Sequence, residues 1–327
     1  MCRTIRLALV GDTSGLPASL LGSISAEDVS FEAICGSDPS HVEQAARAYG
    51  ARWPFDDLDQ MLREAEPDAV IVAASIADRT ALAKTCLRSK SAVLLLGAPG
   101  TTLTECRALG QVARTANRQL MVGLPHRFSP TGTRARRLLE SGRLGAAAAM
   151  NLTLCWPRRP DEAIPESAPL PFDLVFDAAD RLRSCGLAPQ RLWAVGRPYG
   201  HVSAIVLARD GVAAALALHH TGTPPSAGNR FEWRSEDGGL LTIENDVSLM
   251  CTRGSELVAR HQPSLGLGDD PRVERGYAGM VSSFVAALRD RQGVPFGLPS
   301  ARGSVALAAG IFRAVQTGRA VACRTNR

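Results

Sequence analysis

The sequence predicts a two-domain α/β protein, with a doubly wound parallel sheet followed by an α+β domain built on an open, mainly antiparallel sheet. In the first domain, short runs of aliphatic residues alternate with helical stretches, which is typical of right-handed crossovers onto a parallel sheet. In the second, alternating runs are joined by tight-turn pairs, which are typical of hairpins. The 327 residues, 45% of them hydrophobic, suffice for two domains, and we expect them to span residues 1–123 and 124–327.

Strands and helices of the first domain can be assigned in order. The expected strands are Ile5–Val10, Phe31–Cys35, Ala69–Ala73, Ala92–Leu96 and Gln119–Val122. The clearest helices are Ser40–Tyr49 and Thr104–Ala116. The second helix follows the pattern Thr102-x-x-Glu105, which predicts a capping box because each side chain can bond to the other residue's backbone N–H.

The second domain opens with a helix and then becomes rich in strands. We expect a helix from about Pro130 to Ser141, ended by Gly142, and a strand over Ala147–Leu154. Three turn pairs then predict hairpins: Asp210-Gly211, Asp237-Gly238 and Asn245-Asp246. Near the end, apolar residues at helical spacing predict one buried helix face, made by Val273, Tyr277, Met280, Val281, Phe284, Val285 and Leu288.

Composition argues against several classes of protein. No apolar run approaches the roughly 20 residues of a membrane span, and Gly11-Asp12 interrupts the first apolar run too early for a secretory signal, so we expect a cytoplasmic protein. The eight cysteines are scattered without metal-ligand spacing, so neither a zinc site nor a disulfide framework is expected. The net charge of +5 comes from basic and acidic residues that are intermixed, which argues against nucleic-acid binding.

The order of elements and three local strings resemble the Gfo/Idh/MocA family, named for glucose-fructose oxidoreductase, inositol dehydrogenase and MocA. The strings are PDAVIVAAS (67–75), VGLPHRFSPTGTRARRLLESGRLG (122–145) and a terminal stretch that begins SSFVAALRDRQGVPFG (282–297). The resemblance implies a Rossmann-like first domain that binds NAD(H) or NADP(H), and substrates that are sugars, polyols or their derivatives. It also implies a homodimer or homotetramer formed through the second domain's sheet.

The phosphate-binding loop that the resemblance implies departs from the family pattern G-x-G-x-x-G. Gly11 matches the first glycine, but Thr13 stands at the second, and the third is Leu16 unless the loop is re-registered onto Gly15. The hydroxyl groups of Thr13 and Ser14 could partly replace backbone donors to a phosphate. Gly11, Thr13, Ser14 and Gly15 are therefore the candidate cofactor-binding residues of this loop.

Two further cofactor positions are altered. After the second strand, where an acidic residue usually binds the ribose of NAD, the chain has Gly36 and Ser37, with Asp38 displaced along the chain. A missing acid leaves room for a 2′-phosphate, so NADP(H) is favoured over NAD(H) if a nicotinamide cofactor binds. Ser75 is the candidate residue after the fourth strand, and Arg79 replaces a histidine of the family there.

The residues that handle protons during hydride transfer in this family are both replaced. The family lysine of the E-K-P motif is Ala98, and the family histidine of D-x-G-x-H-x-x-D is Arg181. An arginine with a pKa above about 12 does not donate a proton at neutral pH. The only lysines, Lys84 and Lys90, precede the fifth strand, on the edge of the sheet opposite to the one where ligands bind.

Asp177, His126 and Arg181 are the remaining candidates for catalysis. His126 follows the last strand of the first domain and could act near neutral pH, or it could be a loop histidine bonded to a carbonyl. Asp177 and Arg181 have the i, i+4 spacing of a surface salt bridge, although Arg181 could instead clamp an anion. Candidate substrate-binding residues are Arg127 and Arg158, which could bind an anionic group, and Trp156, which could stack on a ring or fill core.

Three functions are compatible with these replacements. We favour an enzyme that catalyses a redox-neutral reaction, such as isomerisation, elimination or hydrolysis, on a small anionic or sugar-like metabolite. An alternative is an NADP(H)-dependent oxidoreductase with a non-standard proton donor. A second alternative is a binding or accessory protein without catalysis. No metal site is expected.

Overall fold

A computed structural model describes residues 4–12, 20, 28–157, 171–197, 200–221, 228–263 and 276–323. The chain divides into two compact units. The first unit comprises Met1–Pro125 and Gly276–Arg302, and the second comprises His126–Arg275 and Gly303–Arg327. None of the described helices is long and apolar enough to cross a membrane.

The first unit contains a six-stranded parallel sheet with the order β3-β2-β1-β4-β5-β6. Its strands are β1 (Ile5–Gly11), β2 (Val29–Cys35), β3 (Trp53–Phe55), β4 (Ala69–Ala73), β5 (Ala92–Leu96) and β6 (Leu120–Gly123). This is the predicted doubly wound sheet, and its order reverses between β1 and β4, where such folds bind ligands. The edge strand β3 was not predicted, because Pro54 is unusual within a strand and is tolerated only at an edge.

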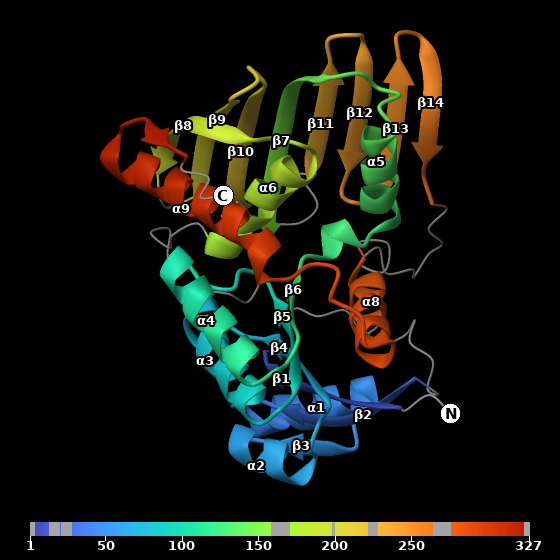
Figure 1. Ribbon diagram of the computed structural model, residues 1–327, viewed down its shortest axis with the longest axis vertical. Helices are drawn as coiled ribbons and strands as arrows, with labels where there is room; N and C mark the ends of the chain where they lie inside the picture. The colour runs from blue at the N-terminus through green and yellow to red at the C-terminus, as the bar shows by residue number, and fades with distance from the viewer. Residues whose placement is uncertain are drawn as a thin grey trace. The chain divides into compact units, whose positions relative to one another are not determined.

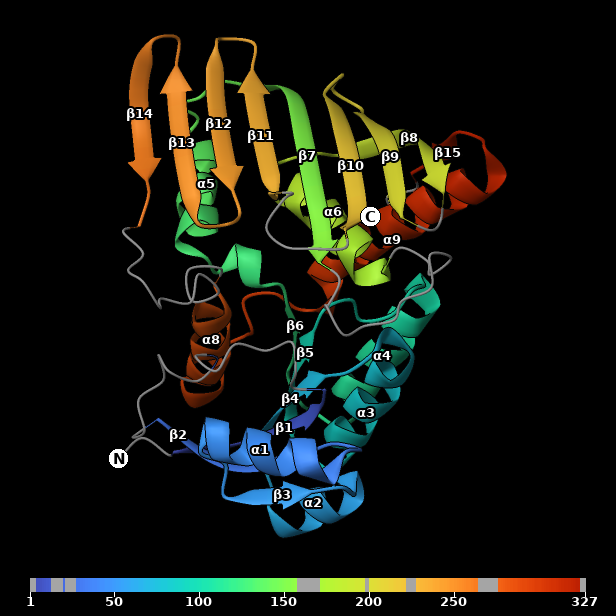
Figure 2. The ribbon, with the colours of Figure 1, turned by 180° about the vertical axis from the view of Figure 1, so that it is seen from behind.

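Helices cover both faces of this sheet (Figures 1 and 2). They are α1 (Pro39–Tyr49), α2 (Leu58–Glu64), α3 (Ile76–Arg88), α4 (Leu103–Thr115) and α8 (Tyr277–Arg289). In both views α3 and α4 lie together on one side and α8 lies on the other. The predicted capping box at the start of α4 is confirmed, since the backbone N–H of Glu105 donates to Thr102 Oγ1 and that of Thr102 to Glu105 Oε2, both at 3.2 Å.

The structure places α8 in the first unit, whereas the sequence-based division assigned all of residues 124–327 to the second domain. The backbone N–H of Val122 donates to the Phe296 carbonyl at 2.8 Å, and the Gln119 amide donates to the Gln292 carbonyl at 2.8 Å. Gly123 leaves room for the Met280 sulfur, which would lie 2.9 Å from an added Cβ. The chain therefore returns to pack on β6, and this return cannot be read from a linear change in composition.

The second unit contains a nine-stranded sheet with the order β14-β13-β12-β11-β7-β10-β9-β8-β15. Its strands are β7 (Ala147–Pro157), β8 (Pro189–Arg197), β9 (His201–Ala208), β10 (Ala213–Thr221), β11 (Arg230–Ser235), β12 (Gly239–Glu244), β13 (Ser248–Arg253), β14 (Glu256–His261) and β15 (Val321–Ala322). Only β7 and β10 pair in parallel, so the sheet is mainly antiparallel as predicted. The three predicted turn pairs join β9 to β10, β11 to β12 and β12 to β13.

The described helices that pack on this sheet lie on one of its faces, and no described helix covers the other face in either view (Figures 1 and 2). They are η2 (Pro125–Arg127), α5 (Pro130–Glu140), α6 (Phe172–Ser184) and α9 (Leu298–Thr317), of which α9 belongs to the second unit from Gly303 on. Burial alternates along β9, where Val202, Ala204 and Val206 are buried and Ile205 is exposed. The core of this unit therefore lies between the helices and one face of the sheet.

Candidate functional site

Three charged side chains of α6 form the centre of the candidate site. Most of the helix is apolar and buried, including Val175, Phe176 and Ala179. Asp177, Asp180 and Arg181 stand at positions i, i+3 and i+4, which bring side chains together on one side of a helix. The sequence pattern predicted roles for Asp177 and Arg181 but not for Asp180, because Asp180 has no counterpart in the family motif.

A tight turn before α5 holds His126 against this helix. The Ser129 hydroxyl donates to the His126 carbonyl at 2.9 Å and accepts from the Gly132 N–H at 2.9 Å. A Cβ on Gly132 would lie 2.0 Å from the His126 carbonyl oxygen, so only glycine fits there. The Thr131 hydroxyl donates to the Asp246 carbonyl at 2.8 Å and so links this turn to the hairpin between β12 and β13.

The His126 imidazole lies between two carboxylates. Its Nδ1 is 2.7 Å from Asp177 Oδ1, its Nε2 is 3.2 Å from Asp180 Oδ2, and the side chain is 7% exposed. Neither nitrogen has the alignment of a regular hydrogen bond, so the attraction is mainly electrostatic. The alternative in which the imidazole bonds to a carbonyl is therefore wrong.

Asp180 is fully buried and is the most heavily bonded carboxylate of the site. It accepts from Arg127 Nε at 2.6 Å and Nη2 at 2.9 Å, and from the Ser304 hydroxyl at 2.9 Å. Arg127, predicted to bind substrate, instead forms this bidentate pair within the protein. The sequence contained one signal for the Arg127–Asp180 pair. It was a carboxylate at an inward-facing position of a helix, with an arginine elsewhere in the chain.

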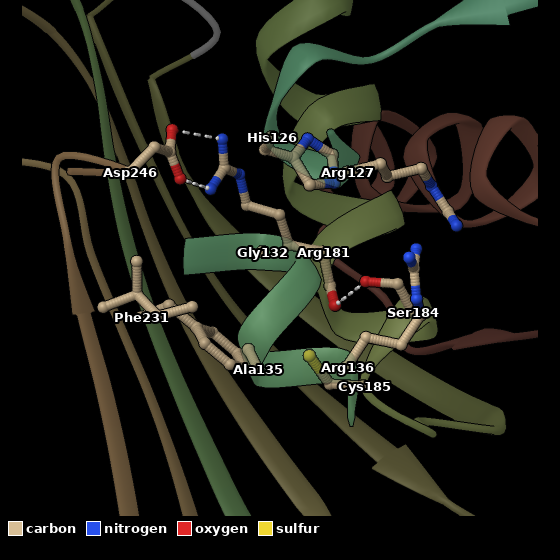
Figure 3. Close-up of a pocket in the computed structure, with 11 residues that line it drawn as sticks. His126, Arg127, Gly132, Ala135, Arg136, Arg181, Ser184, Cys185, Phe231 and Asp246 are labelled. Atoms are coloured by element: carbon tan, nitrogen blue, oxygen red, sulfur yellow. Dashed lines mark hydrogen bonds and ion pairs between the residues drawn. The ribbon is translucent and has the colours of Figure 1, made fainter. Parts of the chain in front are cut away.

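Arg181 is held by two carboxylates. Its Nε donates to Asp177 Oδ2 at 2.8 Å. Its Nη1 donates to Asp246 Oδ1, and its Nη2 donates to Asp246 Oδ2 at 2.9 Å (Figure 3). Asp246 and Asn245 form the hairpin turn and have left-handed φ values of +61° and +53°. Arg181 is only 11% exposed, so it is not part of a surface salt bridge, and its guanidinium is already paired rather than free to clamp an anion.

The charges of this cluster stabilise one another. Burial and Arg181 oppose a charged His126, but Asp177 and Asp180 outweigh them and raise the pKa of His126 above its ordinary value of 6.5. Burial alone would raise the pKa of Asp177, but Arg181 and His126 lower it well below its usual range. Arg181 likewise has a raised pKa, because Asp177 and Asp246 outweigh its burial. The raised pKa favours the imidazolium form of His126, and the lowered pKa of Asp177 favours its carboxylate form.

A small cavity opens beside this cluster, with a volume of about 50 Å³ (Figure 3). This volume suits a few water molecules or one functional group of a larger ligand. Its walls combine His126, Arg181 and Asp246 with the apolar Phe231. Arg136 of α5 also lines it, is exposed, and has no carboxylate partner among the residues described.

The cofactor-binding candidates lie in the first unit. Gly11 ends β1 with φ +112°, and a Cβ there would lie 2.0 Å from the Ala73 carbonyl oxygen. Ser37 is exposed after β2, whereas the Asp38 carboxylate accepts from Ser40 N–H at 3.0 Å and caps α1. Ser75 caps α3 and donates to Asp78 Oδ2 at 2.8 Å.

Some predicted site residues cannot be placed. Thr13, Ser14, Gly15 and Arg158 lie outside the described residues, and so does the side chain of Trp156, although its backbone belongs to β7. Within the described ranges, no group of three or more His, Cys, Asp or Glu residues is arranged to hold a metal ion.

The residue that stands at the position of the family lysine is buried and bonded within the protein. Ala98 is fully buried, and its carbonyl accepts from Arg79 Nη1 at 3.1 Å. Arg79 also donates to the Ala74 carbonyl from Nη2 at 2.7 Å, so it joins the segments that follow β4 and β5. At the carboxyl edge of this sheet, the described residues include Gly11, which permits close approach of a dinucleotide. They include no group that could transfer a proton at the position of the family lysine.

Comparisons with known proteins agree with this fold. Residues 5–124 match the GFO_IDH_MocA family model, described as an oxidoreductase family with an NAD-binding Rossmann fold. The dehydrogenase AclE of Aspergillus oryzae is 28% identical over 163 residues, which are 46% of this chain and only 44% of that protein. Inositol 2-dehydrogenase of Rhizobium meliloti is 23% identical over 305 residues, covering 87% of this chain and 89% of that protein.

Solved structures extend the match to the whole chain. The crystal structure of an oxidoreductase from Agrobacterium radiobacter, in complex with NAD+, L-tartaric acid and magnesium, has a TM-score of 0.83 and 16% identity. The match covers 98% of this chain and 99% of that one. At this level of identity the likeness concerns the fold.

Proposed function

We propose that this protein, whose residues 5–124 match the Gfo/Idh/MocA oxidoreductase family model, is an enzyme of this fold that converts a small sugar-like or anionic metabolite without net oxidation. The observation that supports this proposal is the loss of both proton-handling positions of hydride transfer. One is the buried Ala98, and the other is Arg181, whose guanidinium is occupied by two carboxylates.

His126 is the proposed proton donor. Its Nδ1 lies against Asp177, as in the His–carboxylate pairs that orient catalytic imidazoles. Its Nε2 faces Asp180, whose oxygens already accept from Arg127 and Ser304, so Nε2–H has the weaker protein partner. In the proposed step, the imidazolium passes a proton to an oxygen of a substrate bound in the cavity that His126 lines, and the neutral imidazole then regains a proton from solvent. A pKa raised above 6.5 suits this role because it increases the protonated fraction of the donor at a given pH.

The proposed substrate is a small polyhydroxylated compound, with or without a carboxylate. The relative from Rhizobium meliloti is named for inositol, and the neighbour from Agrobacterium radiobacter was crystallised with L-tartaric acid. Arg136, which has no carboxylate partner among the described residues, offers the cavity one cation for an anionic group. Asp177 and Arg181 are assigned to positioning, since each is held by protein partners.

The test is a turnover screen of polyols, sugars and sugar acids, followed by NMR, with nicotinamide absorbance recorded in parallel. We expect a product to form without a stoichiometric change in nicotinamide, and His126→Gln to lower its rate by about 10²–10⁴-fold. Glu236→Gln, an exposed carboxylate in the β11–β12 turn of the same unit, is the control and should retain the rate. Turnover that consumes nicotinamide stoichiometrically, or that is unchanged in His126→Gln, would contradict the proposal.

A second candidate is an NADP(H)-dependent oxidoreductase with His126 as a non-standard acid. It is favoured by Ser37, which leaves the ribose position without a carboxylate because Asp38 is engaged as a helix cap. When bound, the cofactor would supply or accept hydride, and Gly11 and Ser37 are the described residues that would hold it. Calorimetric titration with NADPH and NADH tests this candidate. Tight binding of a metabolite without any turnover would instead support the third function, a non-catalytic binding protein.

We also propose a cytoplasmic location and a homodimer or homotetramer formed through the nine-stranded sheet. The seven described cysteines are free thiols, a state typical of a reducing compartment. The helix-free face of the sheet exposes Trp193, Val195 and Ile205 on two adjacent strands. Apolar surface gathered in this way favours association with a second copy.

A further inference from the structure

A groove runs along the amino edge of the first unit's sheet, at the opposite end of the strands from Gly11. Its volume is about 1020 Å³. The turns that lead into β4, β5 and β6 line it, together with the start of β1 and the end of α8. A space of this size accommodates a metabolite as large as a nucleotide.

The groove is strongly basic. Among the described residues that line it, two are acidic, Glu66 and Asp68, and six are basic: Arg6, Arg63, Lys90, Arg118, Arg289 and Arg291. Arg6 is paired with both acids, since its Nη1 lies 3.5 Å from Glu66 Oε2 and its Nε lies 3.8 Å from Asp68 Oδ2. Arg289 is also paired, with its Nη1 2.5 Å from Asp28 Oδ1. The other four cations have no carboxylate partner among the described residues.

Two of these unpaired cations have a left-handed backbone conformation, which glycine or asparagine usually adopts. Lys90 and Arg291 follow the ends of α3 and α8 with φ values of +69° and +54°. Glycine or asparagine usually occupies this left-handed position after a helix. Arg118 is oriented more firmly, because its guanidinium donates to the carbonyls of Lys90 and Asn117.

An unpaired acceptor accompanies the cations. Gln119 lines the groove, and its Nε2 donates to the Gln292 carbonyl at 2.8 Å. Its Oε1 is buried without a hydrogen-bond partner among the described residues. A buried acceptor left without a donor costs free energy, so a hydroxyl or amine of a ligand would be favourable there.

The ends of the helices determine how many charges a ligand needs. Helices α2, α3, α4 and α8 all end beside this groove, and helix C-termini carry partial negative charge. That charge stabilises the cations in the absence of ligand and disfavours a singly charged anion. A ligand with two or more negative charges can engage several of the unpaired cations at once.

We propose that this groove binds a small phosphorylated or polycarboxylated metabolite, with at least two negative charges and a hydroxyl or amine that donates to Gln119. The site is separate from the carboxyl edge of the sheet, where dinucleotides bind. It does not depend on the reaction proposed above.

Calorimetric titration at low ionic strength, with inorganic triphosphate, citrate and acetate as probes, tests the site. We expect triphosphate or citrate to bind, with the tighter probe identifying phosphate or carboxylate as the ligand chemistry, and acetate not to bind. The double variant Lys90→Asn/Arg291→Asn keeps residues that tolerate a left-handed backbone, and it should bind at least about tenfold more weakly, equivalent to about 1.4 kcal/mol.

The control is Lys84→Gln/Arg47→Gln, which removes two positive charges from the same unit on α3 and α1, outside the groove. It should bind the probes as the unmodified protein does. Absence of binding by both triphosphate and citrate would overturn the proposal. An equal loss of affinity in both double variants would also overturn it, because it would reflect net charge rather than this groove.

Discussion

At the scale of residues, the second unit contains a buried set of charges in which nearly every member has more than one partner. Asp180 shows this most clearly, since it is fully buried and accepts from Arg127 and Ser304 while it faces His126. Burying a carboxylate is costly unless its partners replace water. Loss of one member therefore leaves an uncompensated buried charge on the others.

Substitution of Asp180 by Asn should destabilise the protein by about 3–5 kcal/mol, because Arg127 and His126 would lose their shared counter-charge. Urea denaturation at neutral pH measures the effect. Glu236→Gln, the same chemical change at an exposed turn of this unit, should be close to neutral. Equal stabilities of the two variants would contradict the assignment of Asp180 as the central carboxylate.

Stability should also depend on pH through His126. Its folded pKa is raised above the ordinary value of 6.5, so the stability it contributes is fully present below that pH and is lost as the pH rises through the folded pKa. The difference in urea midpoint between the unmodified protein and His126→Gln should therefore shrink as the pH rises above 6.5 and through the folded pKa. A difference that stays constant or grows over this range would show that His126 is not held as a cation.

At the scale of elements, two turns position the site. The hairpin at Asn245-Asp246 brings a carboxylate and a carbonyl to Arg181 and Thr131. The turn before α5 fixes the backbone of His126 through Ser129. Each turn depends on local backbone geometry, and each joins segments that are far apart in the sequence.

Gly132→Ala should lower the stability by about 1–3 kcal/mol and shift the His126 imidazole resonances, because the new methyl group would press on the His126 carbonyl. Denaturation and NMR of the histidine side chains test this outcome. Gly293→Ala is the matched control, since nothing lies within 4 Å of a Cβ added there. If both substitutions were neutral, the close approach at Gly132 would be refuted.

Local sequence signals predicted most elements but few of the contacts within the site. Aliphatic runs located β1, β4 and β5, and turn pairs located the hairpins, because these signals act over a few residues. The partners of His126 and Arg181 come from α6 and the β12–β13 turn, at large sequence separations. Asp246 was identified from its turn signal, but its carboxylate could be assigned to Arg181 only from the fold.

At the scale of the whole molecule, the nine-stranded sheet covers its core on one face, and no helix of the described residues covers the other (Figure 2). On this helix-free face, Trp193 of β8 stands opposite Ile205 of β9, which stands opposite Ala215 of β10. Val195 and Ile205 are 69% and 53% exposed. This apolar row supports the proposed association of copies through the sheet.

The double substitution Val195→Asp/Ile205→Asp should convert the assembly to monomers, because two carboxylates would be buried in the interface of each copy. Light scattering after size-exclusion chromatography should then give the monomer mass of 34.7 kDa, against a multiple of it for the unmodified protein. Trp53→Asp, at an exposed apolar residue of the other unit, should leave the mass unchanged. A monomeric unmodified protein would refute the proposal.

The measurement that tests the central claim most directly is an NMR titration of the His126 side chain, in the unmodified protein and in Asp177→Asn. The account predicts a pKa above 6.5 in the unmodified protein, and a lower one in the variant, because the carboxylate 2.7 Å from Nδ1 would be neutralised. A pKa at or below 6.5, or one unaffected by the substitution, would contradict the assignment of His126 as a proton donor held in its charged form by Asp177.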